Sequence, residues 1–92
     1  MTSKWPNSEF LTNEVITVLK NAGGELSSAD IDKFVISNLQ IDPELLNQMH
    51  SGKRTEISYR LAWIRTKAKQ LELIERTISG KWMLTKKGKL KS

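Results

Sequence analysis

The sequence predicts an α+β domain with three main helices, a short extra helical turn and a C-terminal β-hairpin. Two observations predict it. Apolar residues recur at helical spacing over residues 55–71, and strand-like segments surround a Ser-Gly turn in residues 73–84. A third observation, the sharp difference in charge between the two halves of the chain, bears on the partner. An amphipathic helix followed at once by a short basic hairpin is typical of a winged helix-turn-helix.

The two halves of the chain carry net charges of opposite sign. Residues 1–52 hold three lysines and seven acidic residues, a net charge of −4, whereas residues 53–92 hold twelve Lys or Arg and three Glu, a net charge of +9. This division produces a positive field on one side of the molecule. Because the cations gather in the central helix, the hairpin and the tail, we interpret them as a nucleic-acid-binding surface rather than a merely solvated face.

Length and composition predict one domain over residues 1–92, with a folded core of about 7–85 and a basic tail over 86–92. No apolar run approaches the roughly 18 residues of a membrane span, so we expect no membrane partner. The N-terminus lacks the layout of a signal peptide. The chain has no cysteine, which excludes disulfides and favours a cytoplasmic location.

Two helices are predicted before the central one. The first begins at residue 7 or 8, either of which could cap it, and ends at Gly23-Gly24, since glycine readily adopts the positive φ of a helix C-terminus. The second begins at Ser27 or Ser28, with Asp30 in the position of a capping box.

Two shorter elements complete the prediction. Residues 25–26 are expected to form a very short strand that pairs with the hairpin. Residues 42–49 are expected to form the extra helical turn, because Pro43 suits its first position and Leu45, Leu46 and Met49 give it an apolar side.

The central helix has one apolar face, formed by Ile57, Leu61, Ile64, Ala68 and Leu71. The opposite face is polar and cationic. An α-helix fits the major groove of B-DNA, where its first residues reach base edges and later cations meet phosphates. The DNA contacts expected from this helix and its entry are Arg54, Thr55, Ser58, Tyr59, Arg65, Thr66 and Lys69.

Within this set, Thr55, Ser58 and Tyr59 are placed to contact bases, and Arg65 and Lys69 to contact phosphates. Arg54 could do either.

The hairpin supplies further candidate contacts. Arg76, Ser79 and Lys81 lie at or near its tip, where a wing can touch phosphate or the minor groove. Lys86 and Lys87 belong to the tail, which we expect to be a mobile electrostatic extension. Trp82 and Leu84 alternate with Lys81 and Met83, so they share a face of the hairpin and are expected in the core.

Tyr59 and Trp63 lie four residues apart and off the apolar stripe of the central helix. They could stack on a base, pack under the turn at residues 42–49, or form a dimer surface. Packing under the turn is the interpretation we favour. The alternative function is a protein-interaction winged helix, for dimerisation or for phage or host regulation, with Tyr59 and Trp63 as anchors.

Catalytic chemistry finds no support in the sequence. His50 is the only histidine and there is no cysteine, so no metal site is predicted. Neither GxGxxG nor GxxxxGK[ST] occurs, which argues against a nucleotide phosphate loop. We predict no catalytic residue, no metal and no cofactor.

A longer motif runs from the central helix through the hairpin. Its residues are Arg60, Trp63, Lys67, Lys69, Leu73 and the closing segment Gly80-Lys81-Trp82-Met83-Leu84-Thr85-Lys86-Lys87-Gly88. With this motif, residues 59–88 resemble the N-terminal winged-helix domain of the Mrr family of modification-dependent restriction endonucleases. That family tends to have a small residue after the Trp and a Gly before the Leu of the hairpin, where this chain has Ile64 and Glu72.

The resemblance implies the DNA-recognition domain of a prokaryotic or phage restriction system, which delivers a separate PD-(D/E)xK nuclease domain to modified DNA. These 92 residues contain no such nuclease domain, so we expect no enzyme, and at most the recognition domain of a restriction endonuclease. The expected partner is double-stranded DNA, methylated or unmethylated, together with a nuclease domain or a second copy of the chain.

Overall fold

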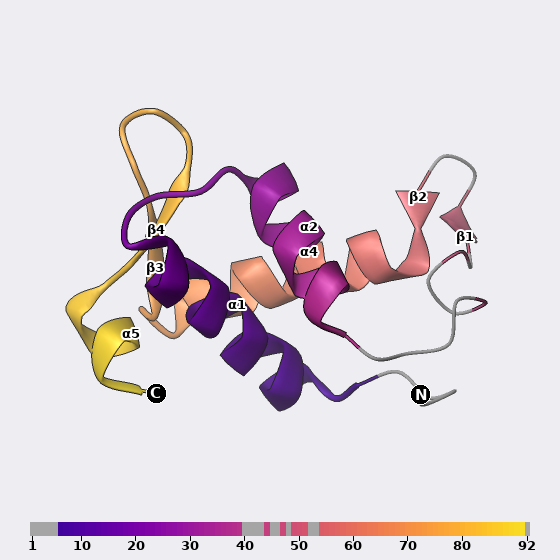
Figure 1. Cartoon of the computed structure of the whole chain (residues 1–92), viewed down its shortest axis with the longest axis horizontal. Coiled ribbons are helices and arrows are strands. Elements are labelled where there is room, and N and C mark those ends of the chain that lie inside the picture. Colours follow the sequence, from indigo (N-terminus) through magenta and orange to yellow (C-terminus); the bar gives the residue numbers. More distant parts are fainter. Residues whose placement is uncertain (1–5, 40–43, 45–46, 48, 52–53, 92) are drawn as a thin grey trace.

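The computed structural model describes residues 6–39, 44, 47, 49–51 and 54–91. Its elements are α1 (Ser8–Ala22), α2 (Ser28–Asn38), β1 (Met49–Ser51), β2 (Arg54–Thr55), α4 (Glu56–Gln70), β3 (Ile74–Arg76), β4 (Trp82–Leu84) and α5 (Lys86–Lys91). Three main helices are grouped together, and the β3–β4 hairpin projects at one end (Figure 1). This is the predicted α+β arrangement of a winged helix.

Local capping sets both ends of α1. The Asn7 side chain accepts the backbone N–H of Phe10 at 2.8 Å. At the other end Gly23 has φ +69°, and its N–H bonds the carbonyls of Leu19 and Lys20. Glycine adopts this left-handed conformation without a Cβ penalty, so the predicted start and end of the helix are confirmed.

Hydroxyl caps begin the other two main helices. Ser27 accepts the N–H of Asp30 at 3.1 Å, and Thr55 accepts the N–H of Ser58 at 3.3 Å. Each cap satisfies one of the N–H groups that lack a partner within the helix. The start predicted for α2 is confirmed, and α4 agrees with the predicted helix of residues 55–71 to within one residue at each end.

The core lies between the three main helices and continues under the hairpin. Four of the five residues predicted for the apolar face of α4 are buried, but Leu71 is 46 % exposed because α4 ends at Gln70. Trp82 and Leu84 are buried as predicted. The core consists of Leu11, Val15, Ile16, Val18, Leu19, Ile31, Val35, Leu39, Ile57, Leu61, Ile64, Ala68, Leu73, Ile74, Trp82 and Leu84.

The hairpin is antiparallel, with Ile74 opposite Leu84 and Arg76 opposite Trp82. Leu26 extends it by one bridge, because its N–H and carbonyl both bond Trp82, at 2.9 and 2.8 Å. The predicted pairing of residues 25–26 with the hairpin is therefore confirmed. The bridge fixes the hairpin just before the start of α2.

Residues 86–91 form the helix α5, and not the mobile basic tail that was predicted. Thr85 begins this helix: its hydroxyl oxygen accepts the N–H of Gly88 at 3.0 Å, and its hydroxyl donates to the carbonyl of Glu72. Gly88 sits so close to the chain that an added Cβ would lie 2.0 Å from the carbonyl oxygen of Leu73. The helix α5 can pack against the backbone at Leu73 because glycine has no Cβ.

The helical turn predicted for residues 42–49 lies mostly outside the described residues. Glu44 is helical, but Met49 belongs to β1 and pairs with Thr55 of β2. The turn was predicted to include Met49, and this part of the prediction is wrong. No helix in the described part of the chain is long and apolar enough to cross a membrane.

Candidate nucleic-acid interface

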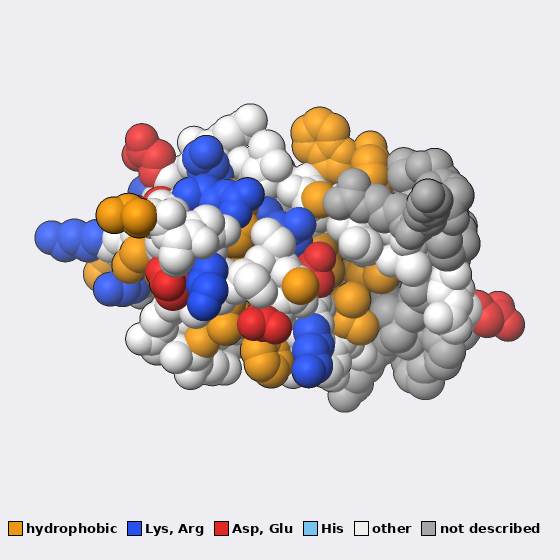
Figure 2. All heavy atoms as spheres, turned by 90° about the horizontal axis from the view of Figure 1, so that it is seen from above, with side chains coloured by type: hydrophobic (Ala, Val, Ile, Leu, Met, Phe, Trp, Pro, Cys, Tyr) orange, Lys and Arg blue, Asp and Glu red, His pale blue; other side chains and the backbone are white. Residues whose placement is uncertain are grey.

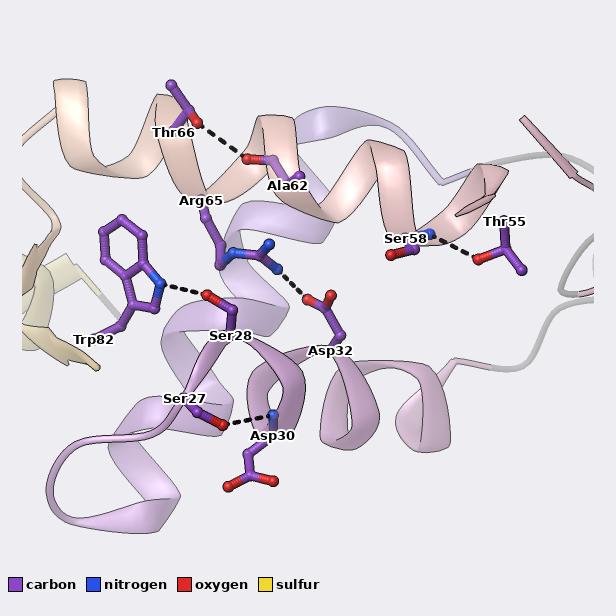
Figure 3. A network of polar contacts seen from close by, with 10 residues as sticks. All are labelled: Ser27, Ser28, Asp30, Asp32, Thr55, Ser58, Ala62, Arg65, Thr66 and Trp82. Carbon is purple, nitrogen blue, oxygen red and sulfur yellow. Dashed lines mark hydrogen bonds and ion pairs between the residues drawn. The ribbon is translucent and has the colours of Figure 1, made fainter. Parts of the chain in front are cut away.

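Two side-chain contacts join α2 to α4 and to the hairpin (Figure 3). Arg65 of α4 forms a hydrogen-bonded ion pair with Asp32 of α2. Trp82 of β4 donates its indole N–H to the hydroxyl of Ser28, in the first turn of α2, at 2.9 Å. The first half of α2, one side of α4 and the hairpin are thus held together around one face.

Arg65 was expected on the exposed cationic face of α4, and this expectation is wrong. The relative solvent exposure of Arg65 is only 9 %. The side chain follows directly after buried Ile64 and lies at the edge of the apolar stripe, where it points at α2 (Figure 3). Asp32 makes this burial tolerable, since a buried charge needs an opposite charge and hydrogen bonds. Arg65 therefore links two helices of the domain.

Lys69 lies one helical turn beyond Arg65 and is exposed. Residues four apart share a side of a helix, so Lys69 belongs to the side of α4 that faces α2 and the hairpin. Thr66 is also exposed, and its hydroxyl donates to the carbonyl of Ala62 at 3.1 Å. Lys67 is exposed as well, but it points about 200° around the helix from Lys69.

The first turn of α4 is less open than predicted. Thr55 and Ser58 are half-buried, and the Thr55 hydroxyl oxygen serves as the helix cap. Tyr59 is also half-buried. The side chain of Arg54 lies outside the described part of the structure.

On the hairpin, Arg76 is held by its own neighbours. Its guanidinium carbon lies 4.5 Å from the centre of the Trp82 ring, and Nη1 donates to the carbonyl of Gly80. A stacked guanidinium keeps some donors free and has less freedom to lose on binding. Lys81, the next cation, is exposed.

Ser79 anchors the tip of the hairpin to the loop between α1 and α2. Its hydroxyl donates to the carboxylate of Glu25 at 2.9 Å and lies 3.0 Å from the hydroxyl of Thr77. Hydrogen bonds from Ser79 and Thr77, together with the charge of Lys81, lower the pKa of Glu25 below its ordinary value of 4.5. The sequence carried no sign of this contact.

Lys86 and Lys87 are exposed, but they do not join the hairpin tip. They belong to α5, which lies at the opposite end of the hairpin from the tip (Figure 1). Lys and Arg side chains gather toward the end of the molecule that carries the hairpin and α5 (Figure 2). We use the name α4–hairpin surface for the exposed candidates of α4 and the hairpin, which are Thr66, Lys69, Arg76, Ser79 and Lys81.

Tyr59 and Trp63 form an edge-to-face pair, with ring centres 6.4 Å apart and planes at 76°. Trp63 is 60 % exposed, so the favoured expectation that it packs under the turn at residues 42–49 is wrong. The pair borders a hollow of about 290 Å³ on the side of α4 that faces the start of α1. The hollow is also lined by Pro6, Ser8, Leu11, Glu56, Arg60 and Ile64.

Three residues that organise this face were not predicted. Asp32 and Ser28 hold α4 and the hairpin, and Glu25 holds the hairpin tip. Each is one of several acids or serines in the first half of the chain, so only the folded contacts distinguish it. Among the residues that the structure describes, no group of three or more His, Cys, Asp or Glu is arranged to hold a metal ion.

Comparison with known proteins supports the motif in residues 59–88. The family model of the Mrr N-terminal domain matches residues 9–91, which is nearly the whole chain. No curated protein and no solved structure matches it. The matched span starts in α1 and ends in α5, so it covers the three main helices, the hairpin and the final helix. The chain therefore belongs to the Mrr N-terminal domain family.

Proposed function

We propose that this chain binds double-stranded DNA as the recognition domain of a Mrr-like restriction system. In this proposal α4 enters the major groove and the β3–β4 hairpin lies on the DNA backbone. The observation that carries it is the α4–hairpin surface, where Lys69 of the helix and Arg76 and Lys81 of the hairpin are exposed beside a shared face. Membership of the Mrr N-terminal domain family supports DNA as the partner.

The cations of this surface have different roles in the proposal. Lys69 and Lys81 contact phosphates, which supply affinity without sequence information. Arg76 is already ordered over Trp82, so it offers its remaining donors with little loss of conformational entropy. Arg65 does not contact DNA; it sets the position of α4 through Asp32.

The outer face of α4 would then meet base edges. Thr66 is exposed there, next to the half-buried Ala62 and Tyr59. Small and aromatic apolar groups in the major groove can contact the C5-methyl group of a pyrimidine. Methylated bases are therefore included among the features that this face reads.

Two lysines of α4 provide a matched test. Lys67 and Lys69 are both exposed and two residues apart, but they point to opposite sides of the helix. We expect Lys69→Ala to weaken binding to a labelled duplex of about two helical turns and to reduce the log–log salt slope by about 1, as for one lost phosphate contact. Lys67→Ala removes the same charge and should change both quantities much less. Fluorescence anisotropy at several salt concentrations measures both.

Equal effects of the two substitutions would show that only net charge matters, and would contradict the docking of α4. Absence of binding at about 50 mM salt, where screening is weak, would contradict DNA binding altogether. The same titration with a methylated duplex tests the reading of modified bases.

A second candidate function is protein interaction through Tyr59 and Trp63. It is favoured by the 60 % exposure of Trp63 beside a hollow, since Trp and Tyr are common interface anchors. This function predicts self-association that survives about 1 M salt, where the Debye length is about 3 Å, and that Trp63→Ala removes. Sedimentation equilibrium would test it, and a monomer under these conditions would contradict the homodimer.

A further inference from the structure

The most exposed large apolar side chain among the described residues is Ile78, at the tip of the hairpin. Its relative exposure is 109 %, and the next highest value is 78 %, for Leu90. Turn positions usually hold Gly, Asn, Asp, Ser or Pro, each of which supplies a special φ or a local hydrogen bond. A β-branched isoleucine supplies neither, so the turn itself does not explain its presence.

The loop that carries Ile78 is closed by its own hydrogen bonds. Thr77 donates its N–H to the carbonyl of Lys81 at 2.9 Å, and Lys81 returns an N–H to the Thr77 hydroxyl at 3.1 Å. Gly80 donates to the carbonyl of Thr77 at 3.0 Å and has φ +80°. This is a three-residue loop with its glycine in the left-handed region. The backbone at the tip is therefore formed before any ligand arrives.

A contact from outside the hairpin adds to this order. Ser79, the residue after Ile78, donates its hydroxyl to the carboxylate of Glu25, in the loop between α1 and α2. The loop is thus held both by its own backbone and by a neighbouring segment. The isoleucine side chain is the part that points into solvent.

The surroundings of Ile78 indicate the kind of surface it would enter. The cations Arg76 and Lys81 lie within three residues of it in the sequence, one on each side, and the tip projects away from the helices (Figure 1). An apolar group between cations fits a ligand with an anionic rim and a less polar interior. The minor groove of duplex DNA has phosphates along its edges and stacked bases and sugars inside. A single isoleucine is a small anchor for a lipid surface.

We propose that Ile78 is an apolar wedge, which enters the minor groove, partly unstacks one base step and bends the DNA. This inference rests on the proposed function and adds that the bound duplex is deformed. Wedges of this kind bend DNA by about 20–90°. Pyrimidine–purine steps are the easiest to unstack, so the hairpin would favour DNA with such a step at its contact point. The wedge would thereby give sequence preference at a position without hydrogen bonds to bases.

The test measures bending and affinity on the same duplexes. Donor and acceptor dyes at the two ends of a duplex of about three helical turns, with a central TA step, report the end-to-end distance at saturating protein. Anisotropy reports the affinity. We expect the wild-type protein to increase energy transfer, and Ile78→Ser to bind, up to about ten-fold more weakly, without increasing it. Ile78→Leu, which keeps an apolar wedge, should retain the bend.

Leu90→Ser is the matched control. Leu90 is also exposed, but it belongs to α5, at the other end of the hairpin, so its loss should leave bending unchanged. Because both side chains are exposed, thermal unfolding should show that both serine variants keep the wild-type fold.

The outcomes separate the two proposals. If the wild type and Ile78→Ser both bind and give the same energy transfer, the wedge is overturned and the proposed function stands. Loss of bending in Leu90→Ser to the same extent would also overturn the wedge. No binding of the wild-type protein to any duplex would overturn the proposed function, and with it the wedge.

Discussion

The helices α1 and α4 are both 15 residues long, and each buries one polar side chain. In α1 this is Thr12, whose hydroxyl donates to the carbonyl of Ser8, one turn earlier in the same helix, at 2.7 Å. In α4 it is Arg65, whose carboxylate partner Asp32 lies on α2. A hydroxyl can be satisfied within its own helix, whereas a buried guanidinium needs a partner from elsewhere. The buried polar residue of α4 therefore needs a partner on α2, whereas that of α1 needs no partner from another element.

This difference matters because α4 is the helix proposed to contact DNA. Two residues before Arg65, Trp63 is 60 % exposed, although the arginine is 9 % exposed. Hydropathy alone predicts that the tryptophan is buried and the arginine is exposed. The side of α4 that meets α2 is occupied by a cation, and the aromatic residue is left on the side toward the start of α1.

The largest expected effect comes from breaking the link between α2 and α4. Asp32→Ala removes the carboxylate that neutralises Arg65 and should lower the free energy of unfolding by about 2–4 kcal/mol, less than for a fully buried pair because both side chains keep some exposure. Urea denaturation followed by circular dichroism measures the loss. The double substitution Asp32→Leu with Arg65→Met should recover much of it, because it removes both charges.

The corresponding change in α1 is the control. Thr12→Val removes a hydrogen bond made within one helix, keeps the shape of the side chain, and should cost at most about 1 kcal/mol. Equal losses for Asp32→Ala and Thr12→Val would contradict the distinction drawn between the two helices.

A somewhat smaller effect is expected at α5, which depends on a neighbouring segment as α4 does. Gly88→Ala places a methyl group where the Leu73 carbonyl oxygen lies 2.0 Å away, so backbone must move, at a cost of about 1–3 kcal/mol. Gly24→Ala is a suitable comparison, since an added Cβ there has no atom within 4 Å. Thermal unfolding of both variants tests this, and a Gly88→Ala protein as stable as Gly24→Ala would show that α5 can shift without cost.

The ends of α1 and α4 offer a finer comparison. Gly23 follows α1 with φ +69°, and Glu72 lies just after α4 with φ +62°. Glutamate in this region is strained. Glu72→Gly should therefore raise the free energy of unfolding by about 0.5 kcal/mol, because relief of about 1–2 kcal/mol of strain exceeds the entropic cost of glycine.

Chemical denaturation of Glu72→Gly beside Glu72→Ala measures this gain. Alanine keeps the Cβ and thus the strain, so it should not reproduce the stabilisation. A less stable glycine variant would indicate that contacts of the glutamate side chain outweigh its backbone conformation.

The smallest effect concerns the anchor of the hairpin tip. The lowered pKa of Glu25 means that the folded state favours the carboxylate, so this contribution is fully present above the ordinary value of 4.5 and is lost as pH falls through the lower folded value. Because Glu25 is exposed, we expect a local change at Ser79 and not global unfolding. The amide resonance of Ser79 should shift over that acid range in the wild type and not in Glu25→Gln. A shift that persists in the variant would assign the titration to another group.

Much of the fold was predictable because its signals are local. The predicted caps at Asn7 and Ser27 each act within three residues, and a glycine with positive φ ends α1. The apolar stripe of α4 and the alternation around Trp82 identify the core sides of those elements. The helix α5 was missed because its packing depends on Gly88 approaching Leu73, a contact between two segments 15 residues apart.

The candidate site was predicted less completely. Lys69, Arg76, Lys81 and Thr66 are exposed as expected, whereas the exposure expected for Arg65 was wrong and Thr55 is used as a cap. Helical periodicity identifies the centre of a buried face, but residues at its edge are buried or exposed according to the neighbouring element. The sequence cannot show that Asp32 will stand beside Arg65, because the two are 33 residues apart.

By itself, the sequence determined the three main helices and the β3–β4 hairpin, the caps of α1 and α2, the buried stripe of α4 and the charge difference between the two halves of the chain. These follow from interactions within a few residues and from composition. Only the tertiary structure decided which cations are free to meet a partner, which aromatic side chain stays exposed, and how the hairpin tip is held. Those outcomes depend on contacts between distant segments, such as Arg65 with Asp32 and Ser79 with Glu25, whose pairing exists only once the helices have packed.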